Sequence, residues 1–172
     1  PYDGGLDLAS ISVASIDSIR VGRGASTSAF GGGALGGTVE IQTAGPPEDT
    51  TLRLRAGGGS SNHLELLAAG GGAVGPVRAS VAWELRSRPF ERLPASFPER
   101  RNEDGGPRNN SDRQDHTMHA ALAVGDALAG LELRGTIRDV RRGVPPHIDE
   151  FDPRWWRWDL WRDHQFPLHG HG

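Results

Sequence analysis

The chain has 172 residues, of which 35% are hydrophobic and 24% are charged, and its formal net charge at pH 7 is −3. The hydrophobic content is low for a packed soluble core, and no run of about 18 apolar residues predicts a transmembrane helix. The negative net charge argues against a general nucleic-acid-binding protein, and the absence of cysteine excludes disulfides and thiolate chemistry. The length suffices for one domain or two small ones.

A glycine-rich segment between two short apolar stretches is the most distinctive feature of the first third of the chain. Residues 1–15, ahead of it, carry a loose apolar pattern that predicts only a strand or a turn. Residues 16–21 and 38–43 are rich in β-branched side chains and predict two strands. The glycines between them permit sharp turns with positive φ.

Several interpretations of these glycines are open. Gly31, Gly33 and Gly36 have the spacing of a dinucleotide-binding motif, but that motif requires a strand directly before it and a helix that begins within it. Here a strand is predicted after Gly36. A phosphate-binding Walker loop requires a lysine, and the chain contains none. A plain alternative is a glycine-rich hairpin in an all-β protein.

The rest of the chain alternates between apolar and polar residues with a period of two. Residues 44–49 contain the Pro46-Pro47 pair, which interrupts any central strand. Strands are then predicted at residues 51–56, 63–69, 77–86, 117–124 and 131–138. Short reversals are expected at 57–62, 70–76 and 125–130, and long polar loops at 89–112 and 140–153. Each strand has an apolar face and a charged face, a pattern shared by soluble sheets and by outer-membrane barrels.

Residues 152–163 contain four of the five tryptophans. If this segment is a regular strand, Trp156, Trp158 and Leu160 share one face, and Trp155 and Trp161 lie on the other. The tryptophans then form an aromatic girdle at a membrane interface or a stacking surface for a ligand. A third interpretation is an interfacial amphipathic helix, because Trp155, Trp158 and Trp161 are also spaced by three.

Few other side chains are candidates for catalysis or metal binding. His116 and His119 would point to opposite faces of a strand and so could not bind one metal ion. His147, Asp149 and Glu150 lie in a predicted loop, where contact with a metal chelate is an alternative to simple solvation. No nucleophile, base and acid stand in a recognisable arrangement. We therefore expect no enzyme activity, no resident metal and no cofactor.

The segment from residue 16 to residue 43 resembles the closing part of the plug domain in TonB-dependent outer-membrane receptors. The matching features are a strand that ends in Arg-Gly, an aromatic-Gly step, a pair of glycines and a strand that leads onward. Here they are Arg23-Gly24, Phe30-Gly31, Gly36-Gly37 and residues 38–43. The segment departs from the family pattern at Ala25, Phe30 and Glu40, where proline, tyrosine and asparagine are more common.

This resemblance implies an all-β chain, in which the C-terminal piece of a plug domain (residues 1–45) precedes antiparallel up-and-down strands of an incomplete transmembrane β-barrel. Residues 46–49 would be the hinge and residues 50–172 the first barrel strands. In such a barrel the short reversals at residues 70–76 and 125–130 face the periplasm and the long loops face outward. The chain would then be a fragment, with the signal sequence and most of the plug upstream and most of the barrel downstream.

The implied function is active uptake of a scarce small molecule, such as a siderophore, cobalamin or an oligosaccharide, across the bacterial outer membrane. The implied partners are outer-membrane lipid and the TonB energy-transducing complex, whose contact region lies outside this chain. In the family, the plug arginine that corresponds to Arg23 pairs with glutamates of the barrel wall. The alternative function is a secreted or surface β-rich structural or adhesive domain, which would fold independently in water.

Overall fold

The structure, a computed structural model, describes residues 16–23, 37–125 and 129–171. These residues form eleven β-strands and one short 3₁₀ turn, and they contain no α-helix. Accordingly, no helix in the described ranges has the length and apolar character needed to cross a membrane. The chain divides into two compact units, Pro1–Gly45 and Pro46–Gly172.

The described part of the first unit is an antiparallel hairpin of β1 (Ile16–Arg23) and β2 (Gly37–Thr43). Ile19 and Val21 face Ile41 and Val39 across the pair, and on the opposite face Arg20 forms an ion pair with Glu40 at 3.8 Å. Both predicted strands are therefore present. β2 occupies residues 37–43, where the dinucleotide motif requires its helix to continue, so that interpretation is wrong.

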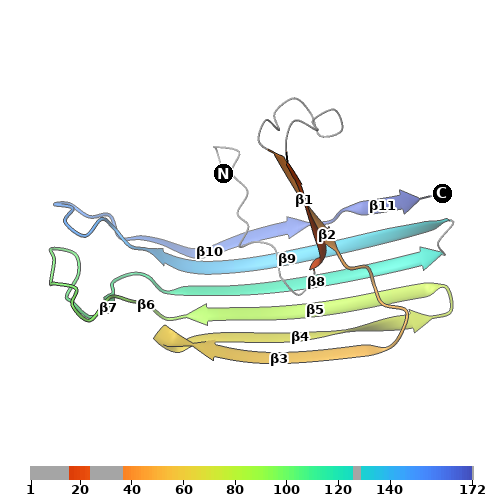
Figure 1. The fold of residues 1–172 in the computed structure, drawn as a ribbon, viewed down its shortest axis with the longest axis horizontal. Coiled ribbons are helices and arrows are strands. Elements are labelled where there is room, and N and C mark those ends of the chain that lie inside the picture. The colour runs from red at the N-terminus through yellow and green to blue at the C-terminus, as the bar shows by residue number, and fades with distance from the viewer. Residues whose placement is uncertain (1–15, 24–36, 126–128, 172) are drawn as a thin grey trace. The chain divides into compact units, whose positions relative to one another are not determined.

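The second unit is a single antiparallel sheet whose strands follow one another in chain order (Figure 1). Each long strand pairs with the next one along the chain, so that the sheet is an up-and-down meander. A short last strand, β11, continues beyond β10 along the same neighbour, β9. The strands are β3 (Thr51–Gly59), β4 (His63–Val74), β5 (Val77–Arg88), β8 (Arg113–Gly125), β9 (Gly130–Val144), β10 (Trp156–Gln165) and β11 (Leu168–His171).

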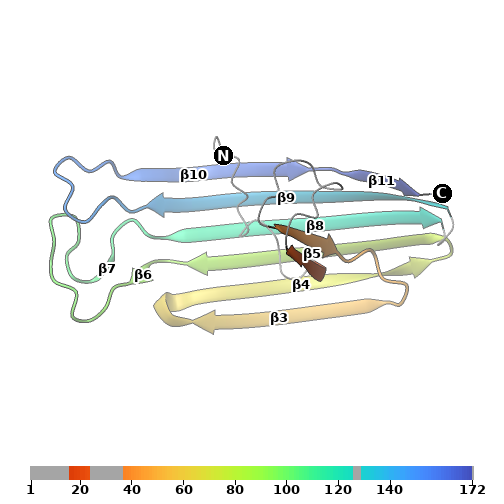
Figure 2. The same cartoon turned by 45° about the horizontal axis from the view of Figure 1, so that its top comes forward.

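The two ends of this sheet carry connections of different length (Figure 2). At one end, here called the turn end, residues 75–76 join β4 to β5 and residues 126–129 join β8 to β9. The other end, the loop end, carries the 3₁₀ turn Ser60–Asn62 and the long connections 89–112 and 145–155. The first long connection contains the small ladder of β6 (Glu91–Arg92) and β7 (Pro107–Arg108).

The strands are longer than the alternating pattern predicts. Residues 57–59 and 70–74, expected in turns, instead pair within the ladder of β3, β4 and β5. Glycine fits there because a Cβ on Gly71 would lie 2.6 Å from the Ala79 carbonyl oxygen and 2.9 Å from Pro47. The turn is confined to residues 60–62, where Ser61 and Asn62 adopt positive φ angles of 62° and 54°. Similarly, β9 extends to Val144 through residues that were expected in a loop.

The register of the sheet aligns most apolar residues of β3, β4, β5, β8 and β9 on one face, here called the apolar face. This face is open rather than packed: Leu122 and Leu133, on two central strands, are 45% and 46% exposed. In the described part of the chain, Ala123 and Val140 are the only buried hydrophobic residues, and both lie on the opposite face. The apolar face carries Leu52, Leu54, Leu64, Leu66, Val77, Val81, Trp83, Leu85, Met118, Leu122, Val124, Leu131, Leu133 and Ile137.

Candidate ligand-binding surface at the loop end of the sheet

The opposite face of the sheet, the charged face, concentrates its ionic side chains near the loop end. Arg88, Arg113 and Arg142 stand side by side on β5, β8 and β9. Like charges directly opposite each other destabilise a sheet unless they have partners. Arg88 reaches Glu91 at 2.6 Å and Arg113 reaches Asp115 at 2.7 Å. These contacts offset part of the repulsion within the row.

Asp115 is the centre of this cluster. Its Oδ2 accepts two hydrogen bonds from Arg113, at 2.7 and 2.9 Å, and one from Arg138 at 3.4 Å. The side chains of Asp115 and Arg138 are only 7% and 3% exposed. A buried charge of either sign is costly without its partner. The two side chains therefore hold each other in position on the charged face.

The tryptophans of β10 lie on this charged face, which corrects the expected arrangement. Trp158 pairs with Arg142 and Trp161 with Val140, so that three steps along β10 match two steps along β9. A β-bulge at residues 159–160 absorbs the extra residue and reverses the alternation beyond it. Trp156, Trp158 and Trp161, here called the tryptophan row, consequently share one face.

Direct contacts agree with this placement. The guanidinium of Arg142 lies 4.0 Å from the ring centroid of Trp158, and that of Arg138 lies 6.0 Å from the ring of Trp161. The rings of Trp158 and Trp161 are 6.1 Å apart and tilted by 55°. Such cation–π geometry is favourable at these distances. Because residues 156–165 form a strand, the amphipathic-helix interpretation is wrong.

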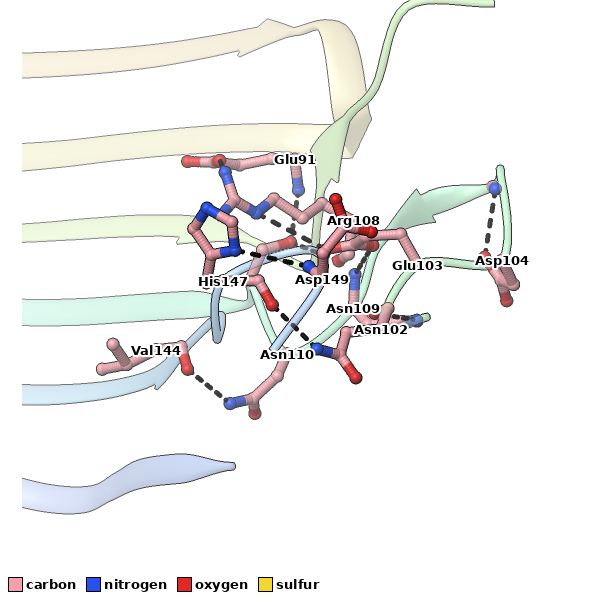
Figure 3. Close-up of polar contacts among 12 residues, drawn as sticks. Glu91, Asn102, Glu103, Asp104, Arg108, Asn109, Asn110, Val144, His147 and Asp149 are labelled. Atoms are coloured by element: carbon pink, nitrogen blue, oxygen red, sulfur yellow. Dashed lines mark hydrogen bonds and ion pairs between the residues drawn. The ribbon is translucent and has the colours of Figure 1, made fainter. Parts of the chain in front are cut away.

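The two long connections at the loop end bind each other through backbone and amide groups (Figure 3). The side-chain amide of Asn102 donates to the carbonyl oxygens of His147 and Glu150 at 2.8 and 2.9 Å, and its backbone N–H donates to Ile148 at 3.1 Å. Glu103, whose side chain is fully buried, accepts a hydrogen bond from the Asn109 N–H at 2.9 Å. The loops therefore form one joined structure, here called the loop cluster.

Asn110 and Asp112 connect the loop cluster to the strands that carry the tryptophan row. The Asn110 amide donates to the carbonyl oxygens of Val144 and Trp156 at 3.0 and 2.9 Å. Arg157 donates to both carboxylate oxygens of Asp112, at 2.8 and 2.7 Å. This bidentate hydrogen bond from Arg157 holds the pKa of Asp112 below its ordinary value. The first loop is thereby attached to the start of β10.

The remaining predicted site residues are not brought together here. Arg23, the predicted plug-barrel lock, is exposed and forms no ion pair with another described residue. Gly37 has φ of +139°, and a Cβ there would collide with the Gly22 carbonyl oxygen, so this member of the predicted turn requires glycine. Trp155 precedes β10 and is 46% exposed. The other predicted turn residues, Gly24, Phe30, Gly31 and Gly36, lie outside the described residues.

The predicted histidines also remain apart. His116 pairs with Asp139 on the apolar face, and His119 pairs with Thr136 on the charged face, where its Nδ1 lies 2.9 Å from the Thr136 hydroxyl. The His147 ring accepts a hydrogen bond from the backbone N–H of Asp149 at 3.3 Å. Within the described residues, no three histidine or acidic side chains are grouped as a metal site requires.

Sequence reasoning missed Arg113, Asp115, Arg138, Arg142 and Asn102. Arg142 was hidden because it falls in the predicted loop at residues 140–153, and Arg113 and Asp115 lie between the predicted loop and the predicted strand. Arg138 lies in a predicted strand, but the pattern does not reveal its contact with Asp115. The alternation does continue through Asp115 and Arg113, so extending the period of two would have placed them. Nothing in the sequence near Asn102 indicates that its amide crosses to the second loop.

Comparison with protein-family models, with curated proteins and with solved structures finds no match for this chain.

Proposed function

We propose that this chain is part of an outer-membrane receptor for active uptake, related to the TonB-dependent receptors that residues 16–43 resemble. In this proposal the sheet of β3 to β11 is barrel wall, its apolar face contacts lipid and its charged face lines a hydrated interior. The loop end is extracellular, and the hairpin of β1 and β2 belongs to the plug. The transported ligand is a small molecule, and the TonB complex supplies the energy.

The open apolar face is the observation that carries this proposal. A soluble sheet must cover its apolar side with another layer, yet the aliphatic side chains here are exposed from the edge strand, where Leu52 is 78% exposed, to the central strands. A lipid bilayer is the environment that such a face requires. The same exposure disfavours the alternative of an independently folding adhesive domain, which needs a dry core.

Strand length and polarity also support the proposal. A barrel strand crosses a bilayer with about 9–11 residues, and β4, β5, β8 and β9 have 12, 12, 13 and 15 residues. The excess lies at the loop end, where the apolar face becomes polar. There Asp139 accepts a bidentate hydrogen bond from Arg162 at 2.7 and 2.9 Å, beside His116. Strands that project beyond the membrane on the extracellular side would have this pattern.

Single cysteines test which face contacts lipid, because the natural chain contains no cysteine. Leu122→Cys and Leu133→Cys label the apolar face. Ala121→Cys and Ala82→Cys are matched controls on the charged face. Each variant of the natural protein is labelled with a bimane fluorophore in outer-membrane vesicles, and nitroxide-labelled phospholipids are then added as quenchers.

We expect the nitroxide lipids to quench the fluorophore at residues 122 and 133 and to leave residues 121 and 82 bright. Quenching at none of the four positions would contradict a membrane location. Quenching only at residues 121 and 82 would show that the faces are assigned the wrong way round.

A further inference from the structure

We propose that the tryptophan row and the polar side chains that follow it on β10 form a binding track for a neutral oligosaccharide. This inference rests on the proposed uptake function and specifies its substrate class. The track consists of Trp156, Trp158, Trp161, Asp163 and Gln165, which the bulge aligns on the charged face.

The bulge is what makes the track. In a regular strand Trp161 would lie on the face opposite to Trp156 and Trp158, and the three rings could not contact one ligand. With the bulge, all three indoles face the side that carries Arg138 and Arg142. A girdle at the lipid interface would require the opposite face, so the aromatic-girdle interpretation does not explain this arrangement.

The rings are available to a ligand. Trp156, Trp158 and Trp161 are 56%, 40% and 40% exposed. Arg142 lies over the Trp158 ring at 4.0 Å and restrains the indole, which nonetheless keeps much of its surface exposed. Indoles combine a large apolar surface with an N–H donor, and rigid aromatic anchors of this kind dominate binding surfaces.

The length of the track favours an extended ligand over a single ring. The partners of Trp156 and Trp161 on β9 are Val144 and Val140, which are four residues apart. At about 3.4 Å per residue the tryptophan row spans about 14 Å. Asp163 and Gln165, joined by a hydrogen bond of 2.8 Å, continue it toward the turn end. Several sugar rings in a chain would fit such alternating apolar and polar contacts.

The balance of charge favours a neutral ligand. Arg113 and Arg138 share Asp115, and Arg86 binds Glu84 at 2.6 Å. With Arg88, Arg142, Glu65, Glu91 and Asp163 on or beside the same face, five arginines stand with five carboxylates, so the surface has no large excess of positive charge that would attract a polyanion. Stacking surface flanked by hydrogen-bonding carboxylate, amide and guanidinium groups suits the C–H faces and hydroxyl groups of a saccharide.

The test measures binding to the natural protein purified from outer membranes in detergent. The probes are maltohexaose, cellohexaose and xylohexaose, with a ferric tris-catecholate complex as the anionic comparison. Tryptophan fluorescence and titration calorimetry report binding. We expect saturable binding of at least one hexasaccharide and weaker or no binding of the catecholate.

Variants then locate the binding surface. Trp158→Ala and Trp161→Ala should each weaken binding by about tenfold or more, whereas Trp83→Ala, which alters the apolar face, should leave the Kd within about twofold. Deleting Leu160 removes the extra residue of the bulge but leaves Trp161 two positions after Trp158 on the same face, so this variant should keep the Kd within about twofold. The alanine variants keep the test decisive if the deletion prevents folding.

The inference would be overturned if none of the three hexasaccharides bound or if the protein preferred the catecholate. It would also be overturned if both alanine variants bound as tightly as the natural protein. None of these results affects the cysteine labelling, which tests the membrane location separately. Absence of lipid quenching at residues 122 and 133 would instead contradict the proposed uptake function, on which the inference rests.

Discussion

At the scale of single residues, the loop end depends on a few ion pairs of good geometry. Asp112 and Arg157 form a bidentate pair between the first long loop and β10, with side chains 34% and 48% exposed. Exposed pairs usually contribute little because water screens them. This one has two parallel hydrogen bonds, and the lowered pKa of Asp112 links its contribution to pH.

The pair should therefore stabilise the protein only while Asp112 is ionised. Because its folded pKa is below the ordinary value of 3.8, the contribution is complete above that value and is lost as the pH falls through the lowered folded pKa. We expect Asp112→Asn to lower the urea midpoint of unfolding at pH 7 and to have no effect at a pH below the folded pKa of Asp112.

Asp159→Asn is the matched control, because Asp159 is 94% exposed and its Oδ1 lies as far as 4.0 Å from the Nε of Arg157, so this ion pair is weak. It should leave the midpoint nearly unchanged at both pH values. An Asp112→Asn effect of equal size at neutral and strongly acidic pH would contradict the assignment to this carboxylate.

At the scale of elements, the close crossing of the first long loop over β9 requires glycine. A Cβ on Gly143 would collide with the carbonyl oxygen of Asn110, and the Gly143 N–H donates to the Asp112 carbonyl oxygen at 3.0 Å. The obstacle is backbone, which a small side-chain movement does not relieve. The position of the loop cluster on the strands thus depends on residue 143 being a glycine, which has no side chain.

Gly143→Ala should separate the loop from β9 and lower the free energy of unfolding by about 1–3 kcal/mol, as inserted groups do at tightly packed positions. Hydrogen exchange at residues 109–112 should increase with it. Gly57→Ala is the control, since a Cβ there meets nothing closer than 3.9 Å. Unchanged exchange in the Gly143 variant would show that the crossing is looser than the structure indicates.

At the scale of the whole molecule, the sheet of the second unit exposes its apolar face and both of its edges. In the described part of the chain, β3 pairs only with β4, and β10 pairs only with β9. Open edges and exposed aliphatic faces both promote aggregation in water. Lipid would cover the apolar face, and further strands, from a longer chain or from another copy, would pair with the open edges.

We therefore expect the 172-residue chain, expressed alone in plain buffer, to aggregate or to remain without cooperative structure. Size-exclusion chromatography and thermal melts followed by circular dichroism measure this directly. A monodisperse monomer that melts cooperatively would contradict the barrel-wall proposal and favour the independently folding β-rich domain.

Much of the fold could be predicted from local sequence because a period of two is a local property. Alternation identified the faces of β5, β8 and β9 correctly, and the prolines at residues 46 and 47 marked a break. The strand ends could not be predicted, because the glycines of β3 and β4 and the polar residues of β9 read as turn or loop. They join the sheet because a neighbouring strand satisfies their backbone groups.

The sequence by itself determined an all-β chain, with apolar and charged side chains sorted to opposite faces, since that sorting follows from residue order alone. Only the tertiary structure decided which way the tryptophans point, because the bulge at residues 159–160 exists only relative to the register of β9. It likewise decided that Asn102 and Asp112 join the two long loops to each other and to β10, through pairings between residues more than 40 positions apart.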